Sequence, residues 1–464
     1  MSDDDTTKAG PNRRSFLKGV GMATAAAAFP HVWVPRRAYA QTEARGAVKH
    51  LIYVRLSGGF RFTTAFNGDV ADRFNPWGKP DKVAAGTEWG PSELLDRASW
   101  LEGDSPAAGL GMKRVTEIAN QICVLPCVDH EPTAGSADGN HNTGLMRFNT
   151  GYAGSGTGIL TMINYGLRDR MPANPEEVIL PAFVLGGGGM GNGTGQYAGY
   201  RPPVLQDGFE GFGFDAGKTL PSWARDMAAR LDERTKERHH ESLRIPIDAY
   251  MQTREATKKY SEIFNNPALQ VGNGSTEPFD GLSNAQLEQM FGNSGTARNL
   301  RLALRLFHFG CPAVFLNQGG YDMHSNEEQD LPGRMNELNQ MISALNAALK
   351  GMTHPTGGTY WDHTLVVFGS EFGRTTRSGK FNSAGGSDHG GDLATRWMSM
   401  PFMGGIIDQA GKGGKSLGQT RSEDLEPLGE VYSYRSVMKT IMDLLGADHS
   451  EFFPADEPFE DLTA

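Results

Sequence analysis

The stretch AVFLNQGGYDMH, residues 313–324, decides the fold. Its first four residues form a short apolar run typical of a buried strand, and Gly319-Gly320 marks the turn behind it. Asp322 and His324 follow within five residues of that turn. Residues able to bind a metal or transfer a proton therefore stand at the end of a predicted strand.

The same pattern repeats on either side of this stretch. Further apolar runs predict strands at 51–56, 121–126, 179–185 and 364–368, and amphipathic segments predict helices at 299–309, 335–349 and 434–445. Strands that are apolar throughout and alternate with helices indicate a doubly wound α/β fold, with a mostly parallel sheet and helices on both faces. Ligands of such sheets gather at the carboxyl ends of the strands.

Candidate ligands follow three of the five predicted strands. They are Asp129-His130-Glu131 and the stretch from Asp138 to Gly144 after the second strand, Asp322 and His324 after the fourth, and Glu371, Asp388 and His389 after the fifth. A single Asp-x-His is common on protein surfaces, but three clusters at strand ends favour a site for Zn or a similar ion. The first strand is followed by Gly58-Gly59-Phe60-Arg61, without a carboxylate. A purely structural role for all three clusters stays open.

The first forty residues predict export. Arg13-Arg14 precedes Phe16-Leu17-Lys18, a weakly apolar run follows, and Ala38-Tyr39-Ala40 offers a cleavage site. Paired arginines in this setting resemble a twin-arginine signal, whose translocase accepts folded cargo. We therefore expect residues 1–40 to be removed and 41–464 to work in the periplasm or outside the cell, with the translocase as a partner during export.

Composition excludes several classes of protein. The chain has 44 basic and 54 acidic residues, of which the signal holds six and three, so the mature chain keeps 38 and 51 and a formal net charge near −13. A surface of that sign makes nucleic acid a poor partner. No stretch after Ala40 is apolar for long enough to span a membrane. Three cysteines, Cys123, Cys127 and Cys311, allow at most one disulfide.

The segment from about Leu220 to Pro278 differs from the rest of the chain. It is highly charged and helical in pattern, as in the run DERTKER at 232–238. Such a charge run is most simply a solvated face. We interpret the segment as a helical arm inserted into one α/β domain that spans 41–464.

The motifs GGYDMHSN (319–326), SEFGR (370–374) and SDHG (387–390) together resemble a family of exported bacterial proteins, domain of unknown function 1501. The resemblance covers nearly the whole mature chain. That family is grouped with the alkaline phosphatase and sulfatase superfamily, so the resemblance implies an alkaline-phosphatase-like fold.

The superfamily's pattern also implies roles for individual residues. Asp322 and His324 match its middle pair of metal ligands, Glu371 stands where an Asp is usual, and His389, with Asp388 beside it, matches its late His. The usual nucleophile lies nine residues before a Thr-Gly. Counting back from Thr150-Gly151 gives His141, and Thr143 is the nearest hydroxyl.

Two departures from the superfamily pattern bear on mechanism: no Asp follows the first strand, and a His replaces the nucleophile. His141 is accordingly predicted as metal ligand, general base or phosphate acceptor. Arg374 and Arg147 are candidates for oxyanion binding or for pairing with a structural carboxylate.

We expect a metal-dependent hydrolase of small phosphate or sulfate esters, with Zn foremost and Mn, Mg or Ca as alternatives. The alternative is a catalytically degenerate relative that binds a ligand or serves envelope assembly.

Overall fold

The computed structural model describes most of the mature chain. The described residues are 46–66, 89–129, 139–154, 156–169, 180–187, 192–207, 209, 262–374, 389, 396–421, 426–429 and 431–462, together with isolated helical positions between 223 and 237. By its contacts the chain divides into two units, Met1–Val34 with Asp215–Glu262, and Pro35–Phe214 with Ile263–Ala464. The sheet and the candidate site belong to the second unit.

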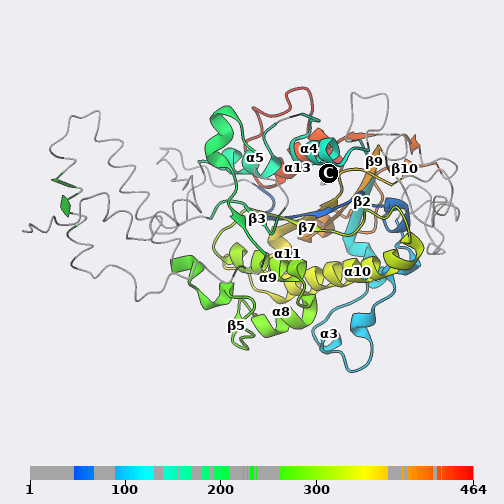
Figure 1. The fold of residues 1–464 in the computed structure, drawn as a ribbon, viewed down its shortest axis with the longest axis horizontal. Coiled ribbons are helices and arrows are strands. Elements are labelled where there is room, and N and C mark those ends of the chain that lie inside the picture. The colour runs from blue at the N-terminus through cyan, green and yellow to red at the C-terminus, as the bar shows by residue number, and fades with distance from the viewer. Residues whose placement is uncertain are drawn as a thin grey trace, which may run out of the picture. The chain divides into compact units, whose positions relative to one another are not determined.

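An eight-stranded sheet forms the centre of this unit (Figure 1). Its strands, in the order in which they lie side by side, are β12 (Tyr432–Ser433), β2 (Ile122–Asp129), β9 (Trp397–Met403), β8 (Thr364–Gly369), β1 (His50–Leu56), β7 (Ala313–Gln318), β3 (Phe183–Leu185) and β4 (Val204–Leu205). Two small antiparallel pairs are β5 (Pro278–Phe279) with β6 (Leu282–Ser283) and β10 (Gln419–Thr420) with β11 (Pro427–Leu428).

The predicted mostly parallel sheet is confirmed. β1 pairs in parallel with β7 and β8, and β3 pairs in parallel with β7 and β4. The exception is β9, which runs antiparallel to both β2 and β8 and was not predicted. Every residue of β1 is buried, as the apolar run at 51–56 indicated, because layers cover both faces of the sheet.

Helices lie on both faces of the sheet (Figure 1). One face carries α4 (His141–Thr150), α5 (Ile159–Gly166) and α13 (Tyr434–Leu444), and the other carries α8 (Asn284–Phe291), α9 (Gly295–His308), α10 (Glu327–Gly351) and α11 (Tyr360–His363). Shorter helices are α3 (Pro106–Gly109) and α12 (Gly405–Gln409). The 3-10 turns are 62–64, 93–95, 99–101, 115–117, 119–121, 195–200, 267–269 and 460–462.

The predicted helical arm, about 220–278, falls largely outside the described residues. Its described positions between 223 and 237 are helical. Its last part belongs to the unit that contains the sheet, where Phe264, Leu269 and Val271 are buried. These three apolar side chains pack into the core rather than form a solvated face, and the bounds of the arm stay a prediction.

Candidate metal centre

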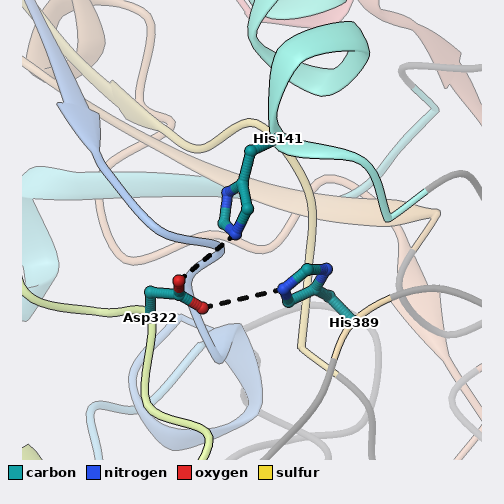
Figure 2. A group of neighbouring side chains, drawn as sticks. All are labelled: His141, Asp322 and His389. Carbon is teal, nitrogen blue, oxygen red and sulfur yellow. Dashed lines mark ion pairs between the residues drawn. The ribbon is translucent and has the colours of Figure 1, made fainter.

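The carboxyl ends of three strands supply the candidate site. Asp322 follows β7, Glu371 follows β8, and His141 opens α4, the first described helix after β2. His389 comes from the segment before β9. Figure 2 shows a nitrogen of its ring turned toward Asp322, and the ring of His141 lies beside it, with centroids 4.5 Å apart. These side chains lie near the carboxyl ends of the strands, where ligands of such sheets gather.

His141, Asp322 and His389 form the centre of the cluster. The Nε2 atom of His141 lies 3.3 Å from Oδ2 of Asp322, and Nε2 of His389 lies 3.7 Å from Oδ1 of the same carboxylate (Figure 2). The ligand atoms of the three residues all lie within 4.8 Å of one another. Ligands held at 2.0–2.2 Å around a tetrahedral ion are about 3.3–3.6 Å apart. The spacing therefore suits a single small cation.

The backbone fixes the ring of His389. Its Nδ1 lies 2.5 Å from the carbonyl oxygen of Gly139, which can only accept a hydrogen bond. In the neutral ring Nδ1 therefore carries the proton, and Nε2 presents a lone pair toward Asp322. The ring of Phe372 stacks on the imidazole at 4.8 Å. Burial is the main cause that lowers the pKa of His389, so the neutral form is favoured.

His141 is held in a similar way by a carboxylate. Its Nδ1 lies 3.4 Å from Oε1 of Glu371, and this interaction raises the pKa of His141. Its Nε2 is buried and makes no hydrogen bond within the described part of the chain. A lone pair and a carboxylate oxygen 3.3 Å apart repel each other unless a positive charge lies between them. That charge is either a proton on the ring or a bound cation.

One turn of the chain positions both imidazoles. Gly139 accepts from His389, and Asn140 is the N-cap of α4, where its side chain accepts hydrogen bonds from the backbone N–H of Asn142 and Thr143. Asn is among the preferred residues at such a cap. His141 is the first residue of the helix, so the cap fixes the backbone position from which the His141 side chain extends.

A buried arginine partners the central carboxylate. Arg374 donates from Nη1 to Oδ1 of Asp322 at 2.7 Å and to the carbonyl of Gly58 at 3.0 Å. Burial opposes ionisation of Asp322, but the hydrogen bond and charge of Arg374 outweigh it and hold the pKa of that carboxyl below its usual range. Of the two roles foreseen for Arg374, the structure shows the pairing with a carboxylate.

Glu371 lies behind His141 and belongs to a buried layer. Its Oε1 accepts from the backbone N–H of Gly58 at 2.8 Å, and its Oε2 lies 3.9 Å from Nε of Arg55. Burial raises the pKa of Glu371, but His141 and Arg55 together lower it further, so the net shift is downward. Gly58 has a φ of +118°, and a Cβ there would lie 2.4 Å from the backbone nitrogen of Asp322.

A family model described as a protein of unknown function (DUF1501) matches residues 49–460. The chain belongs to this family. A twin-arginine translocation signal matches residues 10–30, so the protein is exported across the cytoplasmic membrane, as its first forty residues predicted. Among curated proteins none matches the chain. Within the described residues, no helix combines the length and apolar character that a membrane span needs.

Three further predicted residues lie at the edge of the cluster or in helix α4. His324 touches the cluster, with Nε2 at 3.0 Å from Oδ1 of Asp322 and 3.1 Å from Nε2 of His389, and its side chain is half exposed. The hydroxyl of Thr143 donates to the carbonyl of Asn140, inside the first turn of α4. Arg147 lies in the last turn of the same helix.

Other predicted residues do not join the described cluster. Asp129 forms a two-pronged ion pair with Arg396 and is buried, which is a structural role. His130, Glu131, Asp138 and Asp388 lie outside the described residues.

The sequence interpretation missed three groups. The backbone of Gly58 contacts both Glu371 and Arg374, the carbonyl of Gly139 orients His389, and Arg55 lies against Glu371. Contacts made by backbone groups cannot be predicted from the identity of the residue. Arg55 could have been recognised from the sequence, because it is a charged residue within the mostly apolar run 51–56 of a fully buried strand, where an unpaired charge is costly.

Proposed function

We propose that this DUF1501 protein is an exported, metal-dependent hydrolase of small anionic esters, phosphate or sulfate esters, within an alkaline-phosphatase-like superfamily. The observation that carries the proposal is the position of Nε2 of His141. This nitrogen is buried and makes no hydrogen bond within the described residues, and it faces Oδ2 of Asp322 at 3.3 Å. Buried polar atoms almost always have partners, and a bound ion or a catalytic role is among the explanations for one that lacks a partner in the protein.

The donor set fits a divalent cation. His141, His389 and Asp322 supply two nitrogens and a carboxylate, with His324 at the margin, and such mixed nitrogen and oxygen sets suit Zn and similar ions. Glu371 and the Gly139 carbonyl orient the two rings from behind, as second partners of ligating imidazoles commonly do. A bound divalent cation would polarise an ester oxygen and lower the pKa of an attacking water.

The chain's own groups then have defined tasks. Glu371 holds the Nδ1 proton of His141, which leaves Nε2 either to hold the cation or to take a proton from water. Arg374 keeps Asp322 ionised.

The buried charges favour an anionic substrate. Three buried arginines, Arg55, Arg61 and Arg374, each lie against one carboxylate, Glu371, Glu327 and Asp322 respectively. Each of these three carboxylates therefore has an arginine beside it before any cation binds. A divalent cation would add two positive charges, which an anionic ester would offset.

A second candidate is a catalytically degenerate protein that keeps the fold and part of the site and binds a ligand or serves envelope assembly. It is favoured by the end of β1, where Gly58 supplies only backbone groups, and by Thr143, whose hydroxyl is engaged in its own helix turn. Unlike the hydrolase, this candidate requires neither ester hydrolysis nor a bound metal.

The test combines metal analysis with an ester panel. Purified mature protein should bind about one equivalent of Zn and hydrolyse p-nitrophenyl phosphate or sulfate. His389→Ala should lose both properties and remain folded, whereas the control His449→Ala, a histidine beside Asp443 outside the cluster, should lose neither. His141→Ala separates its roles: metal retained without hydrolysis makes it the base or nucleophile, and metal lost makes it a ligand. Protein that binds no added metal would exclude the hydrolase and leave only the non-catalytic candidate.

A further inference from the structure

Arg55 is a buried arginine whose donors are mostly unused. Its side chain is only 9% exposed, and Nη2 donates to the hydroxyl of Ser57 at 2.9 Å. Nε and Nη1 are buried and make no hydrogen bond with any described residue. Burying guanidinium N–H groups without acceptors destabilises a fold, because the groups lose their hydrogen bonds to water.

The neighbouring carboxylate does not account for this arrangement. The Oε2 atom of Glu371 is 3.9 Å from Nε of Arg55, beyond hydrogen-bond distance, and it accepts from the Ser370 hydroxyl at 3.3 Å. The other oxygen, Oε1, serves Gly58 and His141. An arginine kept only to pair with Glu371 would approach it in the two-pronged geometry that Arg396 adopts with Asp129. The free donors of Arg55 therefore point to a further acceptor.

The strand beside Arg55 carries a buried acceptor that also makes no hydrogen bond with a described residue, the side-chain oxygen of Asn317. Asn317 of β7 is the register partner of Arg55, so the two side chains leave the same face of the sheet. They come from adjacent strands, whose backbones lie about 4.8 Å apart. The amide nitrogen of Asn317 donates to the carbonyl of Gly187 at 2.6 Å. Its Oδ1 is buried and hydrogen-bonds to none of the described residues.

We propose that Arg55 and Asn317 form a subsite for a phosphate group, in preference to sulfate, beside the metal centre; the inference rests on the proposed function. Arg55 offers two N–H donors to anionic oxygens. Asn317 offers an acceptor, which suits a ligand that also carries a hydroxyl. Inorganic phosphate keeps a hydroxyl at neutral pH and sulfate has none, so only phosphate satisfies both residues.

The test is calorimetric titration of the mature protein with inorganic phosphate and with inorganic sulfate, each with bound Zn and after chelation. Arg55→Met should weaken phosphate binding roughly 10- to 100-fold, the equivalent of losing charge-assisted hydrogen bonds, with unchanged Zn content. Asn317→Ala should reduce the preference for phosphate over sulfate about 3- to 10-fold. Arg301→Met, which removes another buried arginine paired with Glu288, should leave phosphate binding intact.

A second variant protects the test against misfolding. Arg55→Lys keeps a positive charge beside Glu371 but lacks the planar fork, so it should fold and still bind phosphate more weakly. Wild-type affinity in both Arg55 variants, or sulfate binding as tight as phosphate, would overturn the subsite while leaving the proposed hydrolase intact. Conversely, a protein that holds no metal and hydrolyses no ester, yet binds phosphate through Arg55, would overturn the proposed function and retain the subsite.

Discussion

At the scale of single residues, the site depends on groups that lie behind the ligand atoms. Glu371 was expected from the family resemblance to be a metal ligand, whereas the structure places its Oε1 against Nδ1 of His141 and the N–H of Gly58. It therefore acts on the cluster through the orientation of an imidazole. The same logic applies to the carbonyl of Gly139 and the ring of His389.

Glu371→Gln tests this indirect role. The amide keeps the size of the side chain but replaces an acceptor oxygen with a donor and removes the negative charge that holds the His141 tautomer. We expect Zn affinity to fall about 10- to 100-fold, as is usual when a partner of a ligating histidine is lost. Competition with a chromogenic chelator measures it. Glu288→Gln, at the carboxylate beside buried Arg301, is the matched control and should leave Zn affinity unchanged. Equal affinity in wild type and Glu371→Gln would remove Glu371 from the site.

A second group of histidines lies at the start of β1 and requires neutral rings. Nδ1 of His50 donates to the carbonyl of Cys311, Nε2 of His354 lies 2.9 Å from Nε2 of His50, and Nδ1 of His354 accepts from the N–H of Thr356. Each ring thus has one proton and one acceptor in use. Burial, with the nearby charges of His363 and Lys49, lowers the pKa of His354 to about 3.

Acid should therefore destabilise the fold through this pair. The folded pKa of His354 lies below the ordinary value near 6.5, so the unfolded chain binds more protons once the pH falls below about 6.5. The free energy of unfolding should decrease between about pH 6.5 and 3, by up to ~1.4 kcal/mol per pH unit for this group. Urea unfolding at several pH values measures the slope. His354→Gln should flatten the slope and His449→Gln should not; parallel curves for wild type and His354→Gln would contradict the assignment.

At the scale of elements, the sequence predicted what depends on long apolar runs. β1, β7 and β8 and the helices α9 and α13 lie within two to four residues of their predicted bounds. β9 was missed because WMSMPFM contains Ser399 and Pro401, and proline argues against a central strand. α10 begins eight residues earlier than predicted, since its first turn is acidic and Pro332 interrupts the apolar pattern.

For the site, the rule that ligands gather at the carboxyl ends of parallel strands predicted which side chains lie close together. It did not predict which of these side chains contact one another. Asp322, His389 and His141 do converge. That Arg374 pairs with Asp322, and that Glu371 faces His141, depends on side-chain directions and on a backbone approach at Gly58. Those directions are set by tertiary packing, which no local pattern in the sequence contains.

The N-cap of α4 is the element that connects fold and site. Asn140→Ala removes the acceptor for two backbone N–H groups and should lower the free energy of unfolding by about 1 kcal/mol. Because Gly139 and His141 flank the cap, the substitution should also weaken Zn binding. Ser294→Ala removes the corresponding cap of α9 and should lower stability without changing Zn affinity. Chemical denaturation and chelator competition measure the two effects, and identical Zn affinity in both variants would show that the cap does not position His141.

At the scale of the whole molecule, the export route and the site are related. The candidate centre draws on β2, β7 and β8 and on residues as distant in sequence as His141 and His389, so it exists only in a folded chain. A twin-arginine signal directs the protein to a translocase that carries folded cargo. The protein can therefore complete its fold, and assemble the candidate centre, before it leaves the cytoplasm.

This relation leads to a prediction about the precursor. Arg13→Lys combined with Arg14→Lys should retain the full-length chain in the cytoplasm, because the paired arginines are the feature that the translocase reads. The retained precursor should be soluble and folded, with the same Zn stoichiometry as exported protein, since the described strands of the sheet all come from the mature chain, beginning at His50. Arg36→Lys with Arg37→Lys alters the other arginine pair of the segment, beyond the matched residues 10–30, and should be exported normally. Cell fractionation, immunoblotting and metal analysis of both variants measure the outcome. Normal export of the first variant would contradict the twin-arginine route, and a retained but unfolded precursor would contradict folding before export.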